Sequence, residues 1–274
     1  MNSVIVIKLG GSSLQNSETL LQLAKLVRGF QKRCYHVVVV HGGGPAINAE
    51  LTRRNIKWQF INGQRQTTPE MMTVIDEVLA RSVNGTLVEE LRLARVSAIG
   101  LSGADDEILF CTQANEELIC VGKVEAVRAA GLKEVLTQFG DKVPVIAPIG
   151  YGSKGEKYNI NADWAACQIA IALSAKKLIF LTDQNGILDH NKQLIPRANS
   201  LLINQMIASG AINGGMLTKV KAMMAALNAG VKYVNVLHAS LASQALRAEP
   251  VGTMLKNICV NKKMNKEVVY ERAH

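Results

Sequence analysis

The 274-residue sequence predicts an α/β fold with a largely parallel central sheet. Short runs of β-branched and aliphatic residues, typical of buried strands, alternate with segments whose apolar residues recur at helical spacing. Such alternation is characteristic of strand–helix–strand units, in which the strands lie parallel and helices cover the sheet. Glycine pairs and triplets follow several of the strand-like runs, where open α/β sheets bind ligands. Hydrophobic residues make up 48% of the chain and aromatic residues only 4%, so a sizeable, mostly aliphatic core is expected.

Composition excludes several classes of protein. The formal net charge of +9 favours anionic partners. No basic cluster with interleaved aromatic residues and no nucleic-acid-binding motif is present, so we expect a small anionic substrate and no nucleic acid. No apolar run reaches the ~20 residues of a membrane span, and no signal peptide is recognisable. The five cysteines are scattered without metal-ligand spacing, which predicts reduced, buried thiols in a cytoplasmic protein and no zinc site.

The first strand and the loop after it form the first candidate ligand site. Residues 4–7 are all β-branched, and Lys8 follows them near the carboxyl end of the expected strand. Gly10 and Gly11 allow the backbone to approach a ligand closely, with N–H groups free to bind an anion. An isolated lysine at a strand end is more often a surface charge, but two further glycine loops and a second lysine favour a ligand site. A helix is expected over residues 17–33.

A second strand and glycine loop follow this helix. Residues 35–40 predict a buried strand that ends in His41-Gly-Gly-Gly-Pro45, where proline opens the next helix. Free amides at a helix start, together with the helix dipole, form an anion site. A triple glycine can also be a simple tight turn. The similar oxyanion loop of lipase-like hydrolases is excluded because no Gly-x-Ser-x-Gly sequence occurs.

A hairpin and a long helix are expected next. Asn62-Gly63 between two short extended segments is a strong signal for a two-residue hairpin turn. Arg65, just after the turn, is suited to bidentate binding of a carboxylate, although an exposed arginine on a polar turn is an equally simple interpretation. Residues 68–95 predict one long helix with a continuous apolar stripe, which belongs either to the core or to a subunit interface.

The middle of the chain predicts short strands, one helix and a hairpin. The strands are expected at 96–103, 108–112, 117–124 and 143–147, and the helix at 132–139. Gly150-Tyr-Gly-Ser-Lys-Gly155 matches the G-x-G-x-x-G pattern, but the dinucleotide fingerprint must open a helix directly. The residues that follow are expected to be extended, which indicates a polar hairpin tip. No Walker A sequence occurs, so a nucleotide would bind through another type of loop.

The stretch Tyr158-Asn-Ile-Asn-Ala-Asp163 is the second informative part of the sequence. Asn161 is a suitable N-cap for the alanine-rich helix expected over residues 162–173, with Asp163 in its first turn. Capping does not explain Asn159, which lies one strand step earlier on the same face. Asp163 is also well placed to pair with lysines at the edge of the sheet.

The C-terminal third repeats the strand–loop–helix pattern. Its strands are expected at 177–182 and 233–237, the latter being the last, and its shorter helices at 201–209 and 241–247. A polar turn over residues 183–188 follows the first of these strands. Gly214 and Gly215 precede a helix with Lys219 in its first turn, where the helix dipole disfavours a cation and a compensating anion is expected. Residues 257–274 show no clear pattern.

These candidates suit phosphoryl transfer. Three glycine loops and two lysines lie at strand ends or helix starts, as a polyphosphate site requires. No serine or cysteine nucleophile with a partner histidine is evident. A carboxylate acceptor needs neither, because it is already ionised and nucleophilic at neutral pH. Catalysis then consists of positioning and of neutralising charge on the transferred group.

Six motifs, in the same order, resemble the amino acid kinase family. They are Lys8-Leu-Gly-Gly, His41-Gly-Gly-Gly-Pro45, Gly63-Gln-Arg65, Tyr158-Asn-Ile-Asn-Ala-Asp163, Leu181-Thr-Asp183 with Gly186-Ile-Leu-Asp189, and Gly214-Gly-Met-Leu-Thr-Lys219. The resemblance covers about residues 4–256. It implies a three-layer αβα sandwich in one domain over 1–274, with an N-terminal lobe, about 1–175, that binds an acylated amino acid and a C-terminal lobe, about 176–274, that binds ATP.

The activity that the resemblance implies is ATP-dependent phosphorylation of the side-chain carboxylate of N-acetyl-L-glutamate, the second step of arginine biosynthesis. Lys8 and Lys219 would stabilise the transferring phosphoryl group, and Asp163 would orient both lysines. Gly43 and Gly44 would offer their amides to the phosphoryl group and the substrate.

Further residues follow from the same motifs. Arg65 and Asn159 would hold the α-carboxylate and the acetamide region of the substrate. The nucleotide would be bound by Gly10, Gly11, Asp183, Gly186, Ile187, Leu188, Gly214, Gly215 and Met216, within the segments 183–188 and 211–216. Mg²⁺ would be held mainly by the phosphates, without a dedicated protein ligand.

Two departures from the family pattern concern regulation and assembly. His238-Ala239-Ser240 stands where members often carry an Asp-Gly-Arg-like turn. The chain begins at the first strand, without the extra N-terminal helix of arginine-inhibited hexameric members, so an uninhibited homodimer built on helix 68–95 is expected.

Two alternative functions remain open. A kinase of this fold acting on N-succinylglutamate or N-acetylaminoadipate would differ only in the substrate pocket. A catalytically inactive sensor is the other alternative, against which the presence of all three of Lys8, Asp163 and Lys219 argues.

Overall fold

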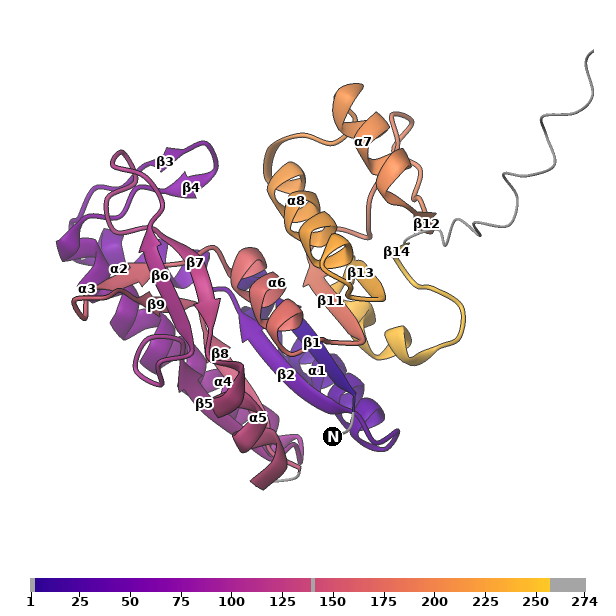
Figure 1. Ribbon diagram of the computed structural model, residues 1–274, viewed down its shortest axis with the longest axis horizontal. Helices are drawn as coiled ribbons and strands as arrows, with labels where there is room; N and C mark the ends of the chain where they lie inside the picture. Colours follow the sequence, from indigo (N-terminus) through magenta and orange to yellow (C-terminus); the bar gives the residue numbers. More distant parts are fainter. Residues whose placement is uncertain (1–2, 139–140, 257–274) are drawn as a thin grey trace, which may run out of the picture.

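An eight-stranded sheet forms the centre of the computed structural model, which describes residues 3–138 and 141–256 (Figure 1). In spatial order its strands are β12 (Arg197–Ala198), β14 (Thr253–Leu255), β13 (Tyr233–His238), β11 (Lys177–Thr182), β1 (Val4–Leu9), β2 (His36–His41), β8 (Val143–Ala147) and β5 (Ala98–Ser102). All neighbouring pairs are parallel except β13 and β14. The predicted mostly parallel sheet is confirmed. The prediction that 233–237 is the last strand is wrong, because the three-residue β14 is too short to show a pattern.

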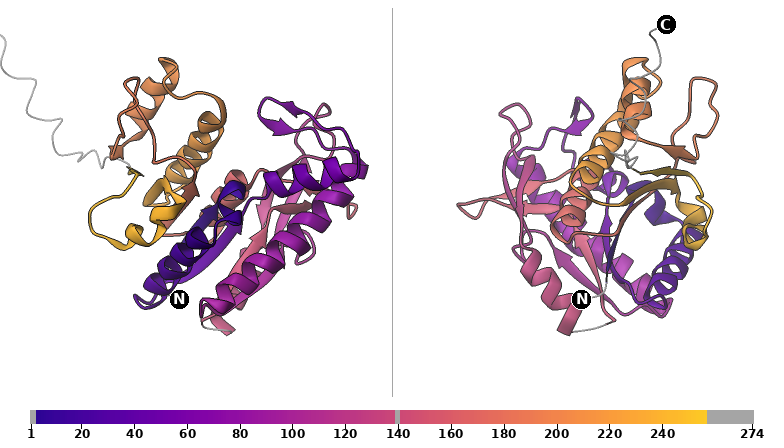
Figure 2. Two further views of the ribbon diagram at one scale, coloured as in Figure 1. Left: turned by 180° about the vertical axis from the view of Figure 1, so that it is seen from behind. Right: turned by 45° about the vertical axis from the view of Figure 1, so that its right-hand side comes forward.

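Alternating residues of the strands face two helical layers. Ile5, Ile7 and Leu9 of β1 pack in a cluster with α1 (Ser17–Gln31), α4 (Asn84–Leu93) and the 3₁₀ segment η3 (Ala239–Leu246), which Figure 2 shows from behind. Val4 and Val6 pack in a cluster on the other face, whose helices are α5 (Ala129–Gln138), α6 (Ala162–Ala172), α7 (Ser200–Ala208) and α8 (Gly214–Asn228). The two layers and the sheet form the expected three-layer sandwich.

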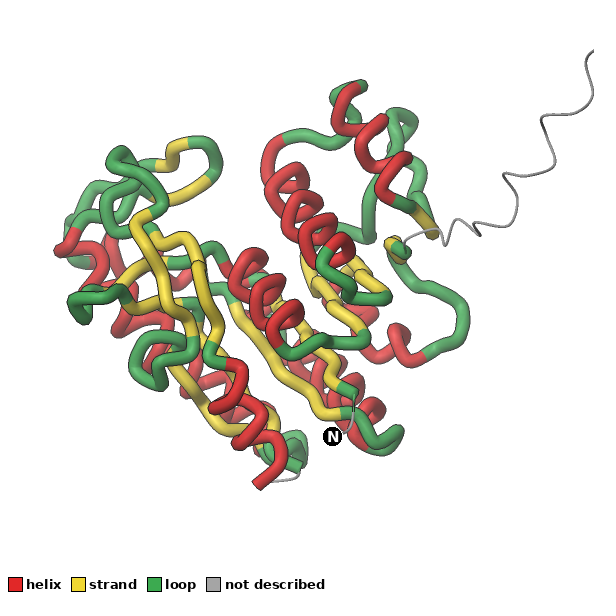
Figure 3. Tube along the Cα trace, viewed as in Figure 1, coloured by secondary structure: helices red, strands yellow, loops and turns green. Residues whose placement is uncertain are grey.

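A second, four-stranded sheet lies in the left half of the molecule as Figure 3 shows it. Its strands are β10 (Lys157–Asn159), β9 (Ile149–Tyr151), β6 (Leu109–Gln113) and β7 (Gly122–Val127). The β9–β10 hairpin carries the sequence from Gly150 to Gly155 near its tip, so that match is not a dinucleotide site. The strand expected at 117–124 begins later, at Gly122.

The predicted two-residue hairpin is also present. It is formed by β3 (Phe60–Ile61) and β4 (Gln64–Arg65), with Asn62 and Gly63 both at positive φ, as its turn requires.

The predicted long helix has an unexpected middle. It consists of α3 (Pro69–Asp76), the π-helical segment η2 (Glu77–Val83) and α4. Its apolar residues, such as Ile75 and Leu79, are buried against the chain's own core, partly against α2 (Gly44–Arg53). The stripe therefore serves the core. Hydrophobic spacing did not reveal the π turn, because a single turn of this kind changes the period too little.

The carboxyl ends of the parallel central strands share one edge of the sheet. β1 runs upward from the N-terminus in Figure 1, toward an edge flanked by the β3–β4 hairpin and by α7. The loops after β1, β2 and β11 meet there. No helix in the described ranges is long and apolar enough to cross a membrane. The end of the helix predicted at 132–139 and the patternless residues 257–274 lie outside the described residues.

Candidate active site

Three charged side chains from three elements meet at this edge of the sheet. Lys8 has the same strand parity as Val4 and Val6, so it points to the face that α6 and α8 cover. Its Nζ lies 2.8 Å from Asp163 Oδ1, in the first turn of α6. Lys219 on α8 donates from Nζ to Asp163 Oδ2 at 2.9 Å. Each of the three residues is at most 8% exposed. We call this cluster the Lys–Asp–Lys triad.

The triad carries a net positive charge in a buried place. Burial alone would raise the pKa of Asp163, but the ammonium groups of Lys8 and Lys219 lower it to about 2. Burial and the charge of Lys8 lower the pKa of Lys219 below its usual range, although Asp163 opposes this shift. One carboxylate balances only one of two ammonium groups, and an anionic ligand would balance the other.

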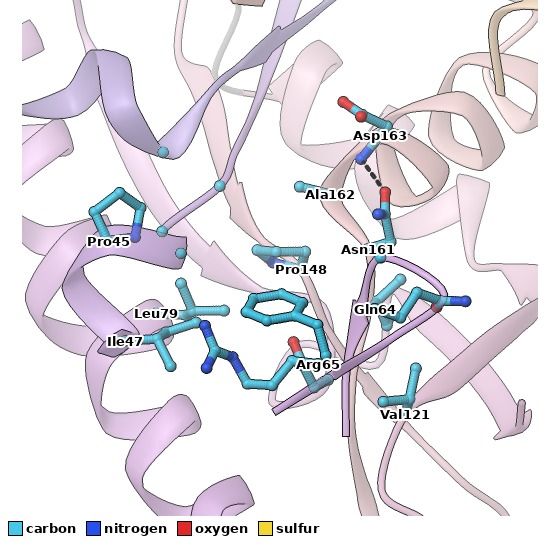
Figure 4. A pocket seen from close by; sticks show the side chains of 18 of the residues that line it. Pro45, Ile47, Gln64, Arg65, Leu79, Val121, Pro148, Asn161, Ala162 and Asp163 are labelled. Carbon is cyan, nitrogen blue, oxygen red and sulfur yellow. Dashed lines mark hydrogen bonds between the residues drawn. The ribbon is translucent and has the colours of Figure 1, made fainter. Parts of the chain in front are cut away.

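A cavity of about 330 Å³ opens beside Lys8 and Asp163. Figure 4 shows Arg65 extending across it toward Ile47 and Leu79, with Pro148 and Asn161 along its border. The sequence predicted four of its lining residues as substrate ligands, which are Gly43, Gly44, Arg65 and Asn159. The structure brings all four together around one space.

Glycines of two loops line this cavity, namely Gly11 after β1 and Gly43 and Gly44 after β2. Gly43 is the N-cap of α2, and neither its N–H nor that of Gly44 or Gly11 has a hydrogen-bond partner in the part of the chain that the structure describes. A Cβ on Gly11 would lie 2.7 Å from Gly43 N and 2.9 Å from Gly44 N, so only glycine allows the two loops to approach this closely. Three unpaired amides this close together could bind an anion, as the sequence predicts for Gly43 and Gly44.

One glycine prediction needs correction. The N–H of Gly10 donates to Leu181 O at 2.9 Å and is not free for an anion. Gly10 joins β1 to β11 and does not line either cavity of the site. Gly11 lines the cavity beside Lys8, whereas the sequence assigned it to the nucleotide.

Contacts hold the guanidinium of Arg65, while its Nη1 stays unpaired among the described residues. Its guanidinium carbon lies 4.9 Å from the ring centroid of Trp58 and 4.8 Å from that of Phe60, and its Nη2 donates to Asn48 Oδ1. Nη1 is buried without a hydrogen-bond partner among the described residues. Burial lowers the pKa of the guanidinium, which an anion beside Nη1 would oppose.

Asn159 and Asn161 border the same cavity from one segment. The side-chain Nδ2 of Asn159 donates to Thr67 Oγ1 at 3.1 Å, which leaves the side-chain oxygen Oδ1 available to accept from a ligand. Asn161 caps α6, accepting from the N–H of Asp163 at 2.9 Å, as predicted. Asn161 also lines the cavity, a role that the sequence did not predict. The sequence likewise did not predict the apolar lining residues Ile47, Phe60, Leu79, Val121, Pro148 and Ile160. Scattered apolar positions have no local signal of a ligand site.

A second cavity, of about 470 Å³, lies on the other side of the triad. Its lining includes most of the residues predicted for the nucleotide, namely Asp183, Gly186, Ile187, Leu188, Gly215 and Met216, together with Lys219. Gly214, predicted with them, starts α8 at φ +52° and is not part of the lining. Because α8 starts at Gly214, Lys219 lies in the second helical turn, and the prediction that it lies in the first is wrong.

The triad is the boundary between the two cavities. Lys8 and Asp163 line the first, and Lys219 lines the second. A group passing from one cavity to the other would therefore pass the two ammonium groups.

Other ligand chemistry has few candidates in the described ranges. Within residues 3–138 and 141–256, no group of three or more His, Cys, Asp or Glu side chains could hold a metal ion. Cys34, Cys111, Cys120 and Cys167 are free thiols, of which Cys34 is exposed rather than buried as predicted. Cys259 lies outside the described residues.

Comparison with known proteins agrees with these features. A sequence model of the amino acid kinase family matches residues 3–238. A Bacillus cereus protein named acetylglutamate kinase is 40% identical over 253 residues, covering 92% of this chain and 96% of that protein. A Ruegeria pomeroyi protein of the same name is 37% identical over 236 residues, covering 86% and 82%. The crystal structure of smu.665 from Streptococcus mutans superimposes with a TM-score of 0.81 at 28% identity, covering 94% of this chain and all of that one.

The charge of Asp163 should make the stability of the protein depend on pH. The pKa of Asp163 is lowered from 3.8 to about 2, so the stabilisation by its charge is complete above pH 3.8 and is lost as the pH falls through about 2. We expect Asp163→Asn to lower the free energy of unfolding at pH 7. The difference in free energy of unfolding between wild type and Asp163→Asn should shrink by about 2 kcal/mol as the pH falls from 5 to 2, measured by urea unfolding.

A surface carboxylate provides the control for this measurement. Glu249 is exposed and pairs with Arg197 at the surface, so Glu249→Gln should change stability little at any pH. A difference between Asp163→Asn and wild type that does not change from pH 5 to pH 2 would contradict the charge arrangement described here.

Proposed function

This chain belongs to the amino acid kinase family, and we propose that it transfers the γ-phosphoryl group of ATP to the side-chain carboxylate of N-acetyl-L-glutamate, giving N-acetyl-L-glutamyl 5-phosphate. The relatives named acetylglutamate kinase match it over most of both chains, which supports a kinase of this activity. The observation that carries the proposal is the Lys–Asp–Lys triad between two cavities, because positive charge at that point would stabilise a phosphoryl group transferred directly between two bound substrates.

The chain's own residues can lower the barrier without proton transfer. An oxygen of the acceptor carboxylate forms a bond to the γ-phosphorus as the bond to the β,γ-bridging oxygen breaks, and ADP leaves. Lys8 on the acceptor side and Lys219 on the nucleotide side neutralise charge on the transferring group and on the leaving oxygen. Asp163 holds both ammonium groups in place, so that little reorganisation is needed during the reaction.

The acceptor cavity suits an acylated acidic amino acid. The unused Nη1 of Arg65 would take the α-carboxylate, and the amides of Gly43 and Gly44 would take the transferring phosphoryl group and the reacting carboxylate. Asn159 would hold the acetamide. The aromatic rings of Trp58 and Phe60 fix the guanidinium, which reduces the entropy lost on binding.

ATP would occupy the cavity lined by residues 183–188 and 211–216, with Mg²⁺ on its phosphates. Mg²⁺ commonly binds through substrate phosphates and only one or two carboxylates, and Asp183 is the carboxylate in the lining of this cavity. Bound there, the ion supplies additional neutralisation of phosphate charge.

Lobes, assembly and location are parts of the same proposal. An N-terminal lobe, about 1–175, binds the amino acid, and a C-terminal lobe, about 176–274, binds ATP. The protein works in the cytoplasm as a homodimer built on helix 68–95. That helix uses its apolar stripe inside the chain, so the dimer would form through its outward side chains, which include Thr73, Glu77, Arg81, Glu89 and Leu93.

A hydroxylamine trap tests the function, because an acyl phosphate reacts with hydroxylamine to give a coloured hydroxamate. The protein is incubated with MgATP and, separately, N-acetylglutamate, N-succinylglutamate, N-acetylaminoadipate, aspartate and glutamate. We expect a strong signal with N-acetylglutamate alone. A signal with another acid would mean that the enzyme phosphorylates a different substrate by the same reaction. The absence of a signal with every acid would contradict the proposal.

Lys8→Met should lower kcat at least ~100-fold, because removing one charged donor to the transferring group typically costs about 3 kcal/mol of transition-state stabilisation. The KM values for both substrates should change little. Lys25→Met removes an exposed lysine from α1 and serves as the matched control. A kcat near that of wild type in Lys8→Met would remove Lys8 from the mechanism.

Arg65→Ala should act mainly on binding of the amino acid. We expect the KM for N-acetylglutamate to rise roughly 10- to 100-fold, as for loss of a hydrogen bond to a charged group, while the KM for ATP stays within about two-fold. Steady-state kinetics with each substrate varied separately measures both. An unchanged KM for N-acetylglutamate would mean that its α-carboxylate is held elsewhere.

A further inference from the structure

The glycine loop after β2 is held by a buried histidine that the proposed mechanism does not use. His41, the last residue of β2, has no exposed surface. Its Nδ1 lies 2.8 Å from the carbonyl oxygen of Gly42, and its Nε2 lies 3.1 Å from Nδ2 of Asn84. The same Nδ2 lies 2.8 Å from Val145 O, so both N–H groups of the Asn84 amide have acceptors.

These contacts allow only one protonation state of the ring. The carbonyl oxygen of Gly42 can only accept, so Nδ1 must carry a proton and donate it. The Asn84 atom that faces Val145 O must be the amide nitrogen, so Nε2 must accept from it. His41 is therefore a neutral ring with its proton on Nδ1. Burial lowers its pKa to about 4, despite its hydrogen bond to Gly42, which agrees with this state.

The hydrogen bond to Gly42 sets the direction of a neighbouring amide. The described part of the chain has no cis peptide bond, so the C=O of Gly42 and the N–H of Gly43 point in opposite directions across one planar unit. With the carbonyl held toward His41, the N–H of Gly43 is directed toward Gly11 and the acceptor cavity. A peptide between two glycines is otherwise free to rotate, and a rotated unit would present a carbonyl oxygen to the incoming phosphoryl group.

The π-helical segment η2 places two side chains, Leu79 and Asn84, close to this glycine loop. Leu79 and Asn84 are five residues apart, which in an α-helix would direct them about 140° apart. The i→i+5 hydrogen bonds of η2 bring such residues near one face. Leu79 thus packs against Gly43, where an added Cβ would lie 2.3 Å from its Cδ2, while Asn84 reaches His41. Gly100 leaves room for Asn84, since a Cβ there would lie 2.2 Å from Asn84 Oδ1.

We propose that His41 and Asn84 are positioning residues, which hold the Gly42–Gly43 peptide so that the Gly43 N–H faces the transferring phosphoryl group. The π turn places Leu79 and Asn84 near the same face of the helix, where Leu79 contacts Gly43 and Asn84 reaches His41. The inference rests on the proposed function, because it assigns the Gly43 amide to the phosphoryl group.

The tautomer of His41 gives the first test and needs no variant enzyme to be active. The chain has five histidines, so ¹⁵N-histidine-labelled protein gives few ring signals. We expect one neutral ring, protonated on Nδ1, that does not titrate between pH 8 and pH 5 and disappears from the spectrum of His41→Asn. A His41 ring protonated on Nε2 would overturn the proposal, whatever acid the enzyme phosphorylates.

Kinetics separate positioning from general stability. His41→Leu and Asn84→Leu should lower kcat roughly 10- to 100-fold, with the KM for ATP within about two-fold, as for loss of one aligned transition-state donor. His41→Asn should retain most of kcat, because its Nδ2 takes nearly the place of the histidine Nδ1 and can still donate to Gly42 O. The matched control is Val88→Ala, a buried residue of α4 outside the network, which should lower Tm with little change in kcat.

Two kinetic outcomes would overturn the proposal. One is a folded His41→Leu enzyme with the kcat of wild type. The other is a loss of kcat in Val88→Ala that equals the loss in Asn84→Leu. The acceptor in these assays is the acid that gives the hydroxamate signal, so an error in substrate identity leaves this comparison intact.

Discussion

The site depends on a single buried carboxylate that holds two ammonium groups. Asp163 reaches Lys8 and Lys219 because α6, β1 and α8 are fixed against one another by the apolar residues around them. Removing both charged lysines from water is costly, and one carboxylate offsets only part of that cost. The remaining positive charge lies where the two cavities meet. An arrangement that is unfavourable without ligand is thereby favourable for a phosphoryl group in transit.

The glycine loops bring uncharged donors to the same point. The amides of Gly11, Gly43 and Gly44 can lie close together because none of these residues has a side chain. The direction of the Gly43 amide is set by the hydrogen bond from His41 to Gly42, and Asn84 holds His41. The lysines that supply charge and the glycine amides that supply oriented hydrogen-bond donors thus come from different parts of the chain. The central sheet joins these parts.

Much of the fold and part of the site could be predicted from the sequence. The β-branched run at 4–7 and the alternation of strands and helices identified the parallel sheet, and strand parity places Lys8 on the face of α6 and α8. The residue pairs that make the site could not be predicted from spacing, because Lys8, Asp163 and Lys219 are far apart along the chain. Three further features likewise depend on neighbours that folding brings together. They are the hydrogen bond from Gly10 N–H to Leu181 O, the aromatic contacts of Arg65 and the π turn before Asn84.

The role of the Lys–Asp–Lys triad is tested most directly by a crystal structure of the protein with MgADP, aluminium fluoride and N-acetylglutamate, in which the aluminium fluoride mimics the phosphoryl group in transfer. We expect Nζ of Lys8, Nζ of Lys219 and the N–H of Gly43 each to lie about 3 Å from a fluoride ligand, with Asp163 still bound to both lysines. A fluoride group bound away from the triad, or an acceptor carboxylate that does not face it, would show that the triad does not stabilise the transferring group.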